Sequence, residues 1–247
     1  FSNGNLKSYG HYKNLINFNG DVICGNINDK SNLELLNDYK FDYIFHQAAI
    51  SDTRVYDQEI VMRTNVNSFY DLLEIAKKNK SVTVYASSGA TYGSLPSPQT
   101  VGKENPENPY GYSKYIMEKV AYNFQIKNPN MKIIGLRFFN VYGPREYFKA
   151  KTSSMIVQLG HQILDGKVPR LFKGSDKILR DFVYIDDTEV YFNRVSDQNS
   201  FIKNKFTDLT VICCEITYSL QDQCDSMSED RLVTNVKEQF VSLGFCK

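Results

Sequence analysis

The sequence has 247 residues, of which 42% are hydrophobic and 23% charged, and its net charge is +1 at pH 7. This balance is typical of a soluble globular chain that is long enough to bury a sizeable core, and it excludes the strongly basic surface that recruits nucleic acid or anionic membranes. No apolar run approaches the roughly 18 residues of a membrane span, and the first residues lack the architecture of a signal peptide. We therefore expect a cytoplasmic protein with no nucleic-acid or membrane partner.

Short β-branched runs alternate with helical patterns along the chain. The long segment 58–80 has apolar positions at helical spacing and ends in the cationic run 77–80, where a helix favours positive charge. Alternation of this kind predicts an α/β fold with a doubly wound, mostly parallel sheet. The predicted strands are 21–27, 43–49, 81–87, 131–140 and 168–172, and the predicted helices are 32–39, 58–80, 110–128 and 155–164.

Two segments on either side of a Pro- and Gly-rich loop carry the strongest chemical pattern. Ser88 follows the predicted strand 81–87, and Tyr110 and Lys114 are four residues apart in a predicted helix. Residues i and i+4 share a helix face, so the phenol and the ammonium point into the same space. A neighbouring cation favours the phenolate, which would make Tyr110 a usable acid/base and Ser88 a hydrogen-bonding partner for a reacting oxygen.

The small residues Ala48 and Ala49 follow a predicted strand, where they either leave room for a ligand or allow close packing of a helix on the sheet. Asn65 lies on or beside the apolar face of a helix, where a polar side chain needs a partner. The residues alone favour a bond to the backbone of a neighbouring loop.

The five cysteines do not form a metal-binding pattern. Cys24 stands alone, and the other four fall in the last 35 residues, far from the three histidines. Because no zinc-type spacing is completed, we expect free thiols and no metal.

Four motifs, taken together and in order, resemble the extended short-chain dehydrogenase/reductase family of nucleotide-sugar epimerases and dehydratases. They are YASSGATYG (85–93), PYGYSK (109–114), LRFFNVYGPRE (136–146) and LRDFVYIDD (179–187). Within that family, FHQAAISDT (45–53) and GPREYFK (143–149) are most similar to the branch that epimerises ADP-heptose at C6.

The resemblance implies a Rossmann-type fold and roles for individual residues. Catalytic roles fall on Ser88, on Tyr110 as acid/base, on Lys114, which holds the nicotinamide ribose, and on Lys149 as a second acid/base on the opposite face of the sugar carbon. The implied cofactor-binding positions are Gln47, Ala48, Ala49, Ile50, Ser51, Asn65, Tyr110, Lys114 and Val141. The implied substrate-binding positions are Ser88, Asn140, Phe172, Ser175 and Arg180.

The implied reaction is redox-neutral. NADP, with NAD as the alternative, takes a hydride from C6 of an ADP-heptose and returns it to the other face, as in heptose supply for lipopolysaccharide cores. The resemblance also implies a homo-oligomer. Two alternatives stay open: a related sugar epimerase or dehydratase, and an inactive remnant that cannot bind cofactor.

The pattern is incomplete at both ends. The sequence contains no G-x-G-x-x-G or G-x-x-G-x-x-G, the glycine-rich turn that cradles a pyrophosphate. The resemblance ends at Asp187. We expect an incomplete NADP-binding domain over 1–140, a partial substrate-binding region over 141–187 and an unassigned tail over 188–247, as in a truncated or frameshifted product or part of a longer chain.

Overall fold

The structure, a computed structural model, describes residues 15, 17–146, 149, 152–175, 178, 180–186 and 211–213. It confirms the α/β class. The main sheet has the strand order β1-β2-β3-β6, and every neighbouring pair is parallel. Its strands are β1 (Tyr43–His46), β2 (Val82–Ser88), β3 (Ile133–Phe138) and β6 (Val211–Cys213).

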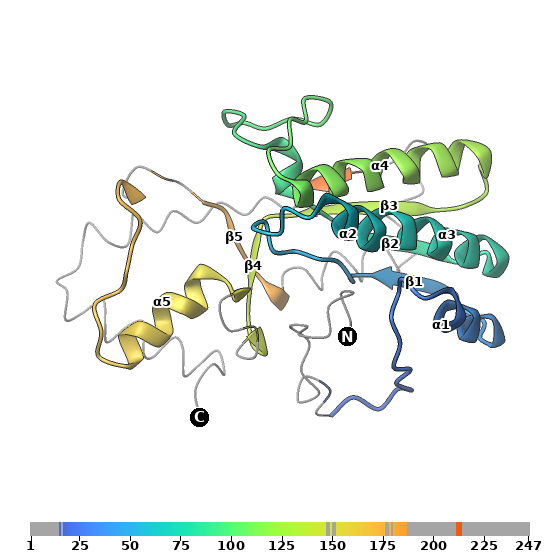
Figure 1. Cartoon of the computed structure of the whole chain (residues 1–247), viewed down its shortest axis with the longest axis horizontal. Helices are drawn as coiled ribbons and strands as arrows, with labels where there is room; N and C mark the ends of the chain where they lie inside the picture. Colours follow the sequence, from blue (N-terminus) through green and yellow to red (C-terminus); the bar gives the residue numbers. More distant parts are fainter. Residues whose placement is uncertain are drawn as a thin grey trace.

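A second, two-stranded parallel sheet lies beside the end of the main sheet, and the helix α5 lies next to it in Figure 1. It pairs β4 (Asn140–Tyr142) with β5 (Phe182–Tyr184). The predicted strand 131–140 covers β3 and ends at the first residue of β4, which belongs to the second sheet.

The predicted helices are present. The first is a short α-helix continued by a 3-10 turn, and the second is interrupted by a π-helical turn at Arg63–Asn67. Such turns occur often at functional positions. The helical segments are α1 (Lys30–Glu34), η2 (Leu35–Asp38), α2 (Gln58–Met62), η3 (Arg63–Asn67), α3 (Ser68–Asn79), η4 (Gly89–Tyr92), α4 (Pro109–Lys127) and α5 (Met155–Leu164).

Two predicted strands are wrong. Residues 21–26 have no strand structure, and Val22 and Ile23 are 45% and 40% exposed. Residues 168–172 also form no strand, and Val168 is 85% exposed. A β-branched run becomes a strand only when a neighbour completes its backbone hydrogen bonds, and neither segment has a paired strand in the described part of the chain. Pro169 also lacks the N–H that a ladder needs.

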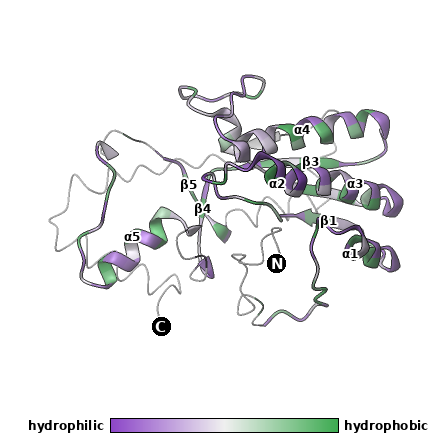
Figure 2. Cartoon of the chain, viewed as in Figure 1, coloured by the Kyte–Doolittle hydropathy of each residue, from purple (hydrophilic) through white to green (hydrophobic). Residues whose placement is uncertain are grey.

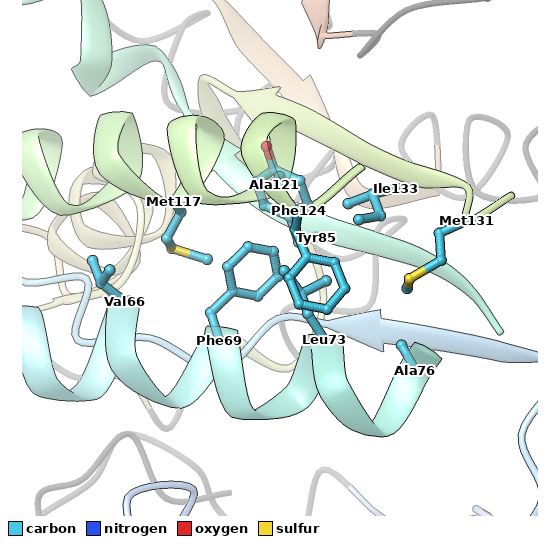
Figure 3. Packing of buried hydrophobic residues seen from close by; sticks show 10 residues of the cluster. All are labelled: Val66, Phe69, Leu73, Ala76, Tyr85, Met117, Ala121, Phe124, Met131 and Ile133. Carbon is cyan, nitrogen blue, oxygen red and sulfur yellow. The ribbon is translucent and has the colours of Figure 1, made fainter. Parts of the chain in front are cut away.

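The core lies between one face of the main sheet and the helices α3 and α4, which run side by side in Figure 1. Figure 2 shows β3 largely in the colour of hydrophobic residues, between helices that carry both colours. Figure 3 shows this cluster, in which the rings of Phe69 and Tyr85 pack at a tilt of 45° with centroids 4.8 Å apart. The cluster is Val66, Phe69, Leu73, Ala76, Tyr85, Met117, Ala121, Phe124, Met131 and Ile133.

The close approach of two strands explains one glycine. Gly135 of β3 is the register partner of Tyr85 in β2, and a Cβ at Gly135 would lie 2.6 Å from the Tyr85 phenol oxygen. The buried ring therefore lies across the glycine, in space that a side chain would occupy.

No helix in the described ranges is long and apolar enough to cross a membrane.

Cys24 is an exposed free thiol. Cys214, Cys224 and Cys246 lie outside the described residues, so the expectation for them stays a prediction.

Truncating the central ring tests this core. Phe69 is fully buried, and we expect Phe69→Ala to lower the free energy of unfolding by about 3–5 kcal/mol, because lost transfer energy and a cavity add. Urea denaturation measures the change. Ile126→Ala is the control, because that side chain is 61% exposed on α4, and its effect should stay within about 0.5 kcal/mol. Similar losses in both variants would contradict this packing.

Candidate active site

Ser88 is the last residue of β2 and caps the 3-10 turn that follows it. Its hydroxyl oxygen accepts a hydrogen bond from the Ala90 amide at 3.1 Å, and the Thr91 hydroxyl donates to the Ser88 carbonyl at 2.9 Å. The Ser88 hydroxyl thus accepts one backbone bond, while its O–H remains available as a donor. The strand end therefore presents an oriented O–H.

The start of α4 is fixed by local sequence. The Asn108 side chain accepts from the Gly111 amide at 2.8 Å, and Pro109 occupies the first helical turn. Both features favour a helix start. A Cβ at Gly111 would lie 2.6 Å from the Ala90 carbonyl oxygen. Glycine at this position lets the helix approach the turn after Ser88, which brings Tyr110 to it.

Ser88, Tyr110 and Lys114 come together as predicted. The side chains of Ser88 and Tyr110 are hydrogen-bonded. The Lys114 ammonium lies 5.9 Å from the centre of the Tyr110 ring and donates to the Ala86 carbonyl at 2.6 Å. Three residues from one strand end and one helix face therefore share a small volume.

Burial, rather than the neighbouring cation, dominates the proton affinities. Burial raises the pKa of Tyr110, and the Ser88 hydrogen bond opposes that rise. Burial also lowers the pKa of Lys114 to about 7. The expectation that Lys114 lowers the pKa of Tyr110 below its usual value is thus wrong for this structure. Burial removes hydration from the phenolate of Tyr110 and from the ammonium of Lys114, so it disfavours both charged forms.

Asn65 holds the loop that follows β1. Its side-chain oxygen accepts from the Ile50 amide at 2.8 Å, and its amide group donates to the Ile50 carbonyl at 3.1 Å and to the Ser113 hydroxyl at 2.8 Å. This agrees with the backbone bond favoured from the residues alone. Asn65 lies in the π-helical turn and ties segment 47–51 to α4, which contains Tyr110 and Lys114.

Exposure in that loop is graded. Ile50 is buried, Ala48 and Ala49 are half-buried, and Gln47 and Ser51 are exposed. Gln47 and Ser51 are therefore open to solvent near the carboxyl end of β1, at the edge of a parallel sheet where ligands of such folds bind.

Glu146 organises the segment that holds Lys149. Its carboxylate is buried and accepts from the Gly143 amide at 3.0 Å and the Ser154 amide at 2.5 Å. Ser154 in turn caps α5. The Lys149 side chain is exposed, and its carbonyl accepts from the Thr152 hydroxyl at 2.8 Å.

The predicted substrate positions lie in and around the second sheet. The Asn140 side chain donates to the Asp181 carbonyl at 2.8 Å, which joins β4 to the residue after the exposed Arg180. The Ser175 amide donates to the Phe172 carbonyl at 3.0 Å, so both belong to one turn. Val141 is the ladder partner of Val183. None of the described contacts joins these residues or Lys149 to Ser88 or Tyr110.

A family profile described as the NAD dependent epimerase/dehydratase family matches residues 4–202. The chain belongs to this family. The match extends past Asp187, where the motif resemblance ends. An ADP-L-glycero-D-manno-heptose-6-epimerase from Brachyspira hyodysenteriae is 35% identical over 205 residues, which is 81% of this chain and 63% of that protein. The chain thus spans less than two thirds of that relative.

Solved structures of the epimerase/dehydratase family have the same fold. The ADP-L-glycero-D-manno-heptose-6-epimerase of Helicobacter pylori is 40% identical, with a TM-score of 0.75 over 94% of this chain and 69% of that one. A UDP-glucose 4-epimerase of Thermotoga maritima, solved with UDP-glucose, is 24% identical, with a TM-score of 0.74 over 93% of this chain and 71% of that one.

The sequence did not point to several buried polar residues that lie around Ser88, Tyr110 and Lys114. His46 is buried and stacks on Phe69, and burial followed by the charge of Lys114 lowers its pKa to about 3. Ser113 accepts from Asn65. Glu118, at i+4 from Lys114, is buried against Arg137 rather than solvated. The sequence signal was the apolar run around Arg137: it lies within β3, where every residue from Ile133 to Arg137 is buried.

The Ser88–Tyr110 contact predicts a change in acidity. We expect Ser88→Ala to raise the pKa of Tyr110, because the lost hydrogen bond stabilises the phenolate. Titration of tyrosine labelled with ¹³C at Cζ measures this, with the Tyr110 signal assigned by its disappearance in Tyr110→Phe. An unchanged or lower pKa would show that the two hydroxyls do not interact.

The buried Lys114 predicts a pH-dependent stability. Its pKa falls from 10.5 to about 7 on folding, so between these values the unfolded chain binds more protons and stability rises with pH. The free energy of unfolding of the wild type minus that of Lys114→Met should therefore increase from pH 7 to pH 10. Urea denaturation across that range measures the difference, and a flat or falling difference would contradict the burial of this amine.

Proposed function

We propose that the protein is a nucleotide-sugar epimerase that interconverts ADP-D-glycero-D-manno-heptose and ADP-L-glycero-D-manno-heptose through transient oxidation at C6. The observation that carries the proposal is the joint placement of Ser88, Tyr110 and Lys114, in a chain 40% identical to the Helicobacter pylori enzyme named for this reaction. The choice of sugar rests on that identity and on the Brachyspira hyodysenteriae relative.

The residues at the strand ends fit the nicotinamide half of a dinucleotide. Lys114 is 2% exposed, and its amino group donates to the Ala86 carbonyl. In the protonated form it has two further donors. The other donors suit ribose hydroxyls. The 47–51 loop is fixed at the carboxyl end of β1, because Asn65 bonds both the N–H and the C=O of Ile50. When bound, NADP, or NAD in its place, supplies hydride acceptance and return.

Proton transfer is the task of the protein. Tyr110 takes the proton of the C6 hydroxyl as the carbonyl forms from one epimer, and in the reverse reaction it returns a proton to that same epimer. Ser88 donates a hydrogen bond to the reacting oxygen. Lys114 holds the ribose.

Inversion at one carbon needs proton transfer on two faces, since one fixed group serves only one. Lys149 is proposed as the second acid/base. Glu146 supports this role indirectly, because its two backbone bonds fix both ends of the segment that contains Lys149. Asn140, Phe172, Ser175 and Arg180 are proposed to contact the nucleotide sugar, and the planar guanidinium of Arg180 suits a diphosphate.

Replacing the phenol tests the acid/base assignment. Tyr110→Phe should lower kcat by about 10²–10⁴-fold with little change in KM, because general acid–base catalysis is lost while binding groups remain. The assay incubates the protein and NADP or NAD with ADP-D-glycero-D-manno-heptose and separates the epimers by chromatography. Tyr112→Phe, an exposed tyrosine on the same helix, is the control.

Two outcomes would count against the proposal. An unchanged rate in Tyr110→Phe would remove the acid/base role. A wild-type protein that neither converts the sugar nor gains thermal stability from NADP or NAD would favour a chain that does not bind cofactor.

A further inference from the structure

Three consecutive residues at the end of β2 each bond a different turn of α4. The Ala86 carbonyl accepts from Lys114, the Ser87 hydroxyl donates to Glu118 at 2.5 Å, and Ser88 bonds Tyr110. The helix residues are spaced four apart and so form one stripe. Two of these contacts involve groups of the proposed chemistry, whereas Glu118 does not take part in it.

Glu118 is fixed from the neighbouring strand. Arg137 of β3 donates through Nε to one carboxylate oxygen at 2.8 Å and through Nη2 to the other at 2.5 Å. Glu118 and Arg137 are 5% and 1% exposed, and Arg137 is the register partner of Ser87. A buried, bidentate, charge-assisted pair is strong and geometrically restrictive, so the carboxylate has little freedom to move.

The same guanidinium also holds the segment that leads into α4. Its Nη2 donates to Glu104, whose carboxylate accepts from the Gly102 amide at 2.9 Å, and its carbon lies 4.5 Å from the centre of the Tyr92 ring. Tyr92 belongs to the turn that Ser88 caps. Arg137 thus contacts elements on both sides of the Ser88–Tyr110 pair.

We infer that Glu118, held by Arg137 and Ser87, is a positioning residue that sets how α4 lies on the end of β2 and hence how Tyr110 meets Ser88. The effect of Glu118 on catalysis rests on the proposed function. The effect of Glu118 on Tyr110 does not, because it can be measured without turnover. A displacement of about 1 Å at a catalytic group can cost about 100-fold in rate.

The test uses the full chain with Glu118→Gln and Ser87→Ala. The first keeps a side chain of the same shape but weakens the pair with Arg137. The second removes one bond and keeps the ion pair, so it is the milder change. Lys119→Gln is the matched control, because Lys119 is the exposed next residue of α4. Thermal unfolding of each variant reports stability separately.

The decisive readout is the ¹³Cζ signal of Tyr110. We expect Glu118→Gln to move this signal and raise the pKa of Tyr110, with a smaller change in the same direction for Ser87→Ala and none for Lys119→Gln. In a Ser88→Ala background, Glu118→Gln should have much less effect, because interacting sites are non-additive. In the epimerase assay kcat should fall by about 10-fold or more with KM within about 2-fold.

Lower melting temperatures with an unmoved Tyr110 signal and pKa in both variants would overturn the inference and leave Glu118 a purely stabilising residue. Equal effects of Glu118→Gln with and without Ser88 would also overturn it. Failure of the proposed function looks different, since the wild-type protein would then not convert the sugar while the Tyr110 signal still responded to Glu118→Gln.

Discussion

The ion pair of Arg137 with Glu118 is the contact on which the site's arrangement depends. It joins the middle of the main sheet to α4, and through Glu104 and Tyr92 it also reaches the loop before the helix and the turn after β2. Burial opposes the charge of Arg137, but the bonds and charges of its carboxylate partners raise its pKa overall, so it stays ionised. Breaking such a pair costs about 3–5 kcal/mol, whereas replacing it with apolar residues is often neutral. The ion pair therefore serves mainly to fix the geometry of α4 on the sheet, rather than to raise the free energy of unfolding.

Dehydration governs the chemistry of this edge of the sheet. Lys114 and His46 are both more than nine-tenths buried, and both have pKa values lowered by burial. His46 is then neutral, and Lys114 adds a positive charge at the strand ends when it is protonated. An anionic group placed nearby would favour its protonation. The site is thus arranged to respond to the charge of what it binds.

Several features could be predicted from the sequence because they depend on local pattern. Apolar periodicity located α3, α4 and α5, and the spacing of Tyr110 and Lys114 placed both on one helix face. The missed features depend on partners distant in the chain. Segment 21–27 has the composition of a strand but no neighbouring strand to pair with in the described part of the chain. Glu118, four residues after Lys114, has the spacing of an ordinary solvated ion pair. Only the fold brings Arg137 beneath it.

The π-helical turn at Arg63–Asn67 has a consequence for the helix that contains it. Val61 and Phe69 are both fully buried although eight residues separate them. At about 100° per residue, a regular helix would place them about 80° apart around its axis. Absorbing one extra residue in the wide turn brings the two side chains to within about 20° of the same direction. The turn therefore behaves as an accommodated single-residue insertion. Deleting one residue here would restore regular helical geometry. The apolar faces before and after the turn would stay aligned. The chain could therefore lose a residue at this turn without rotating the apolar residues on one side of it away from the core.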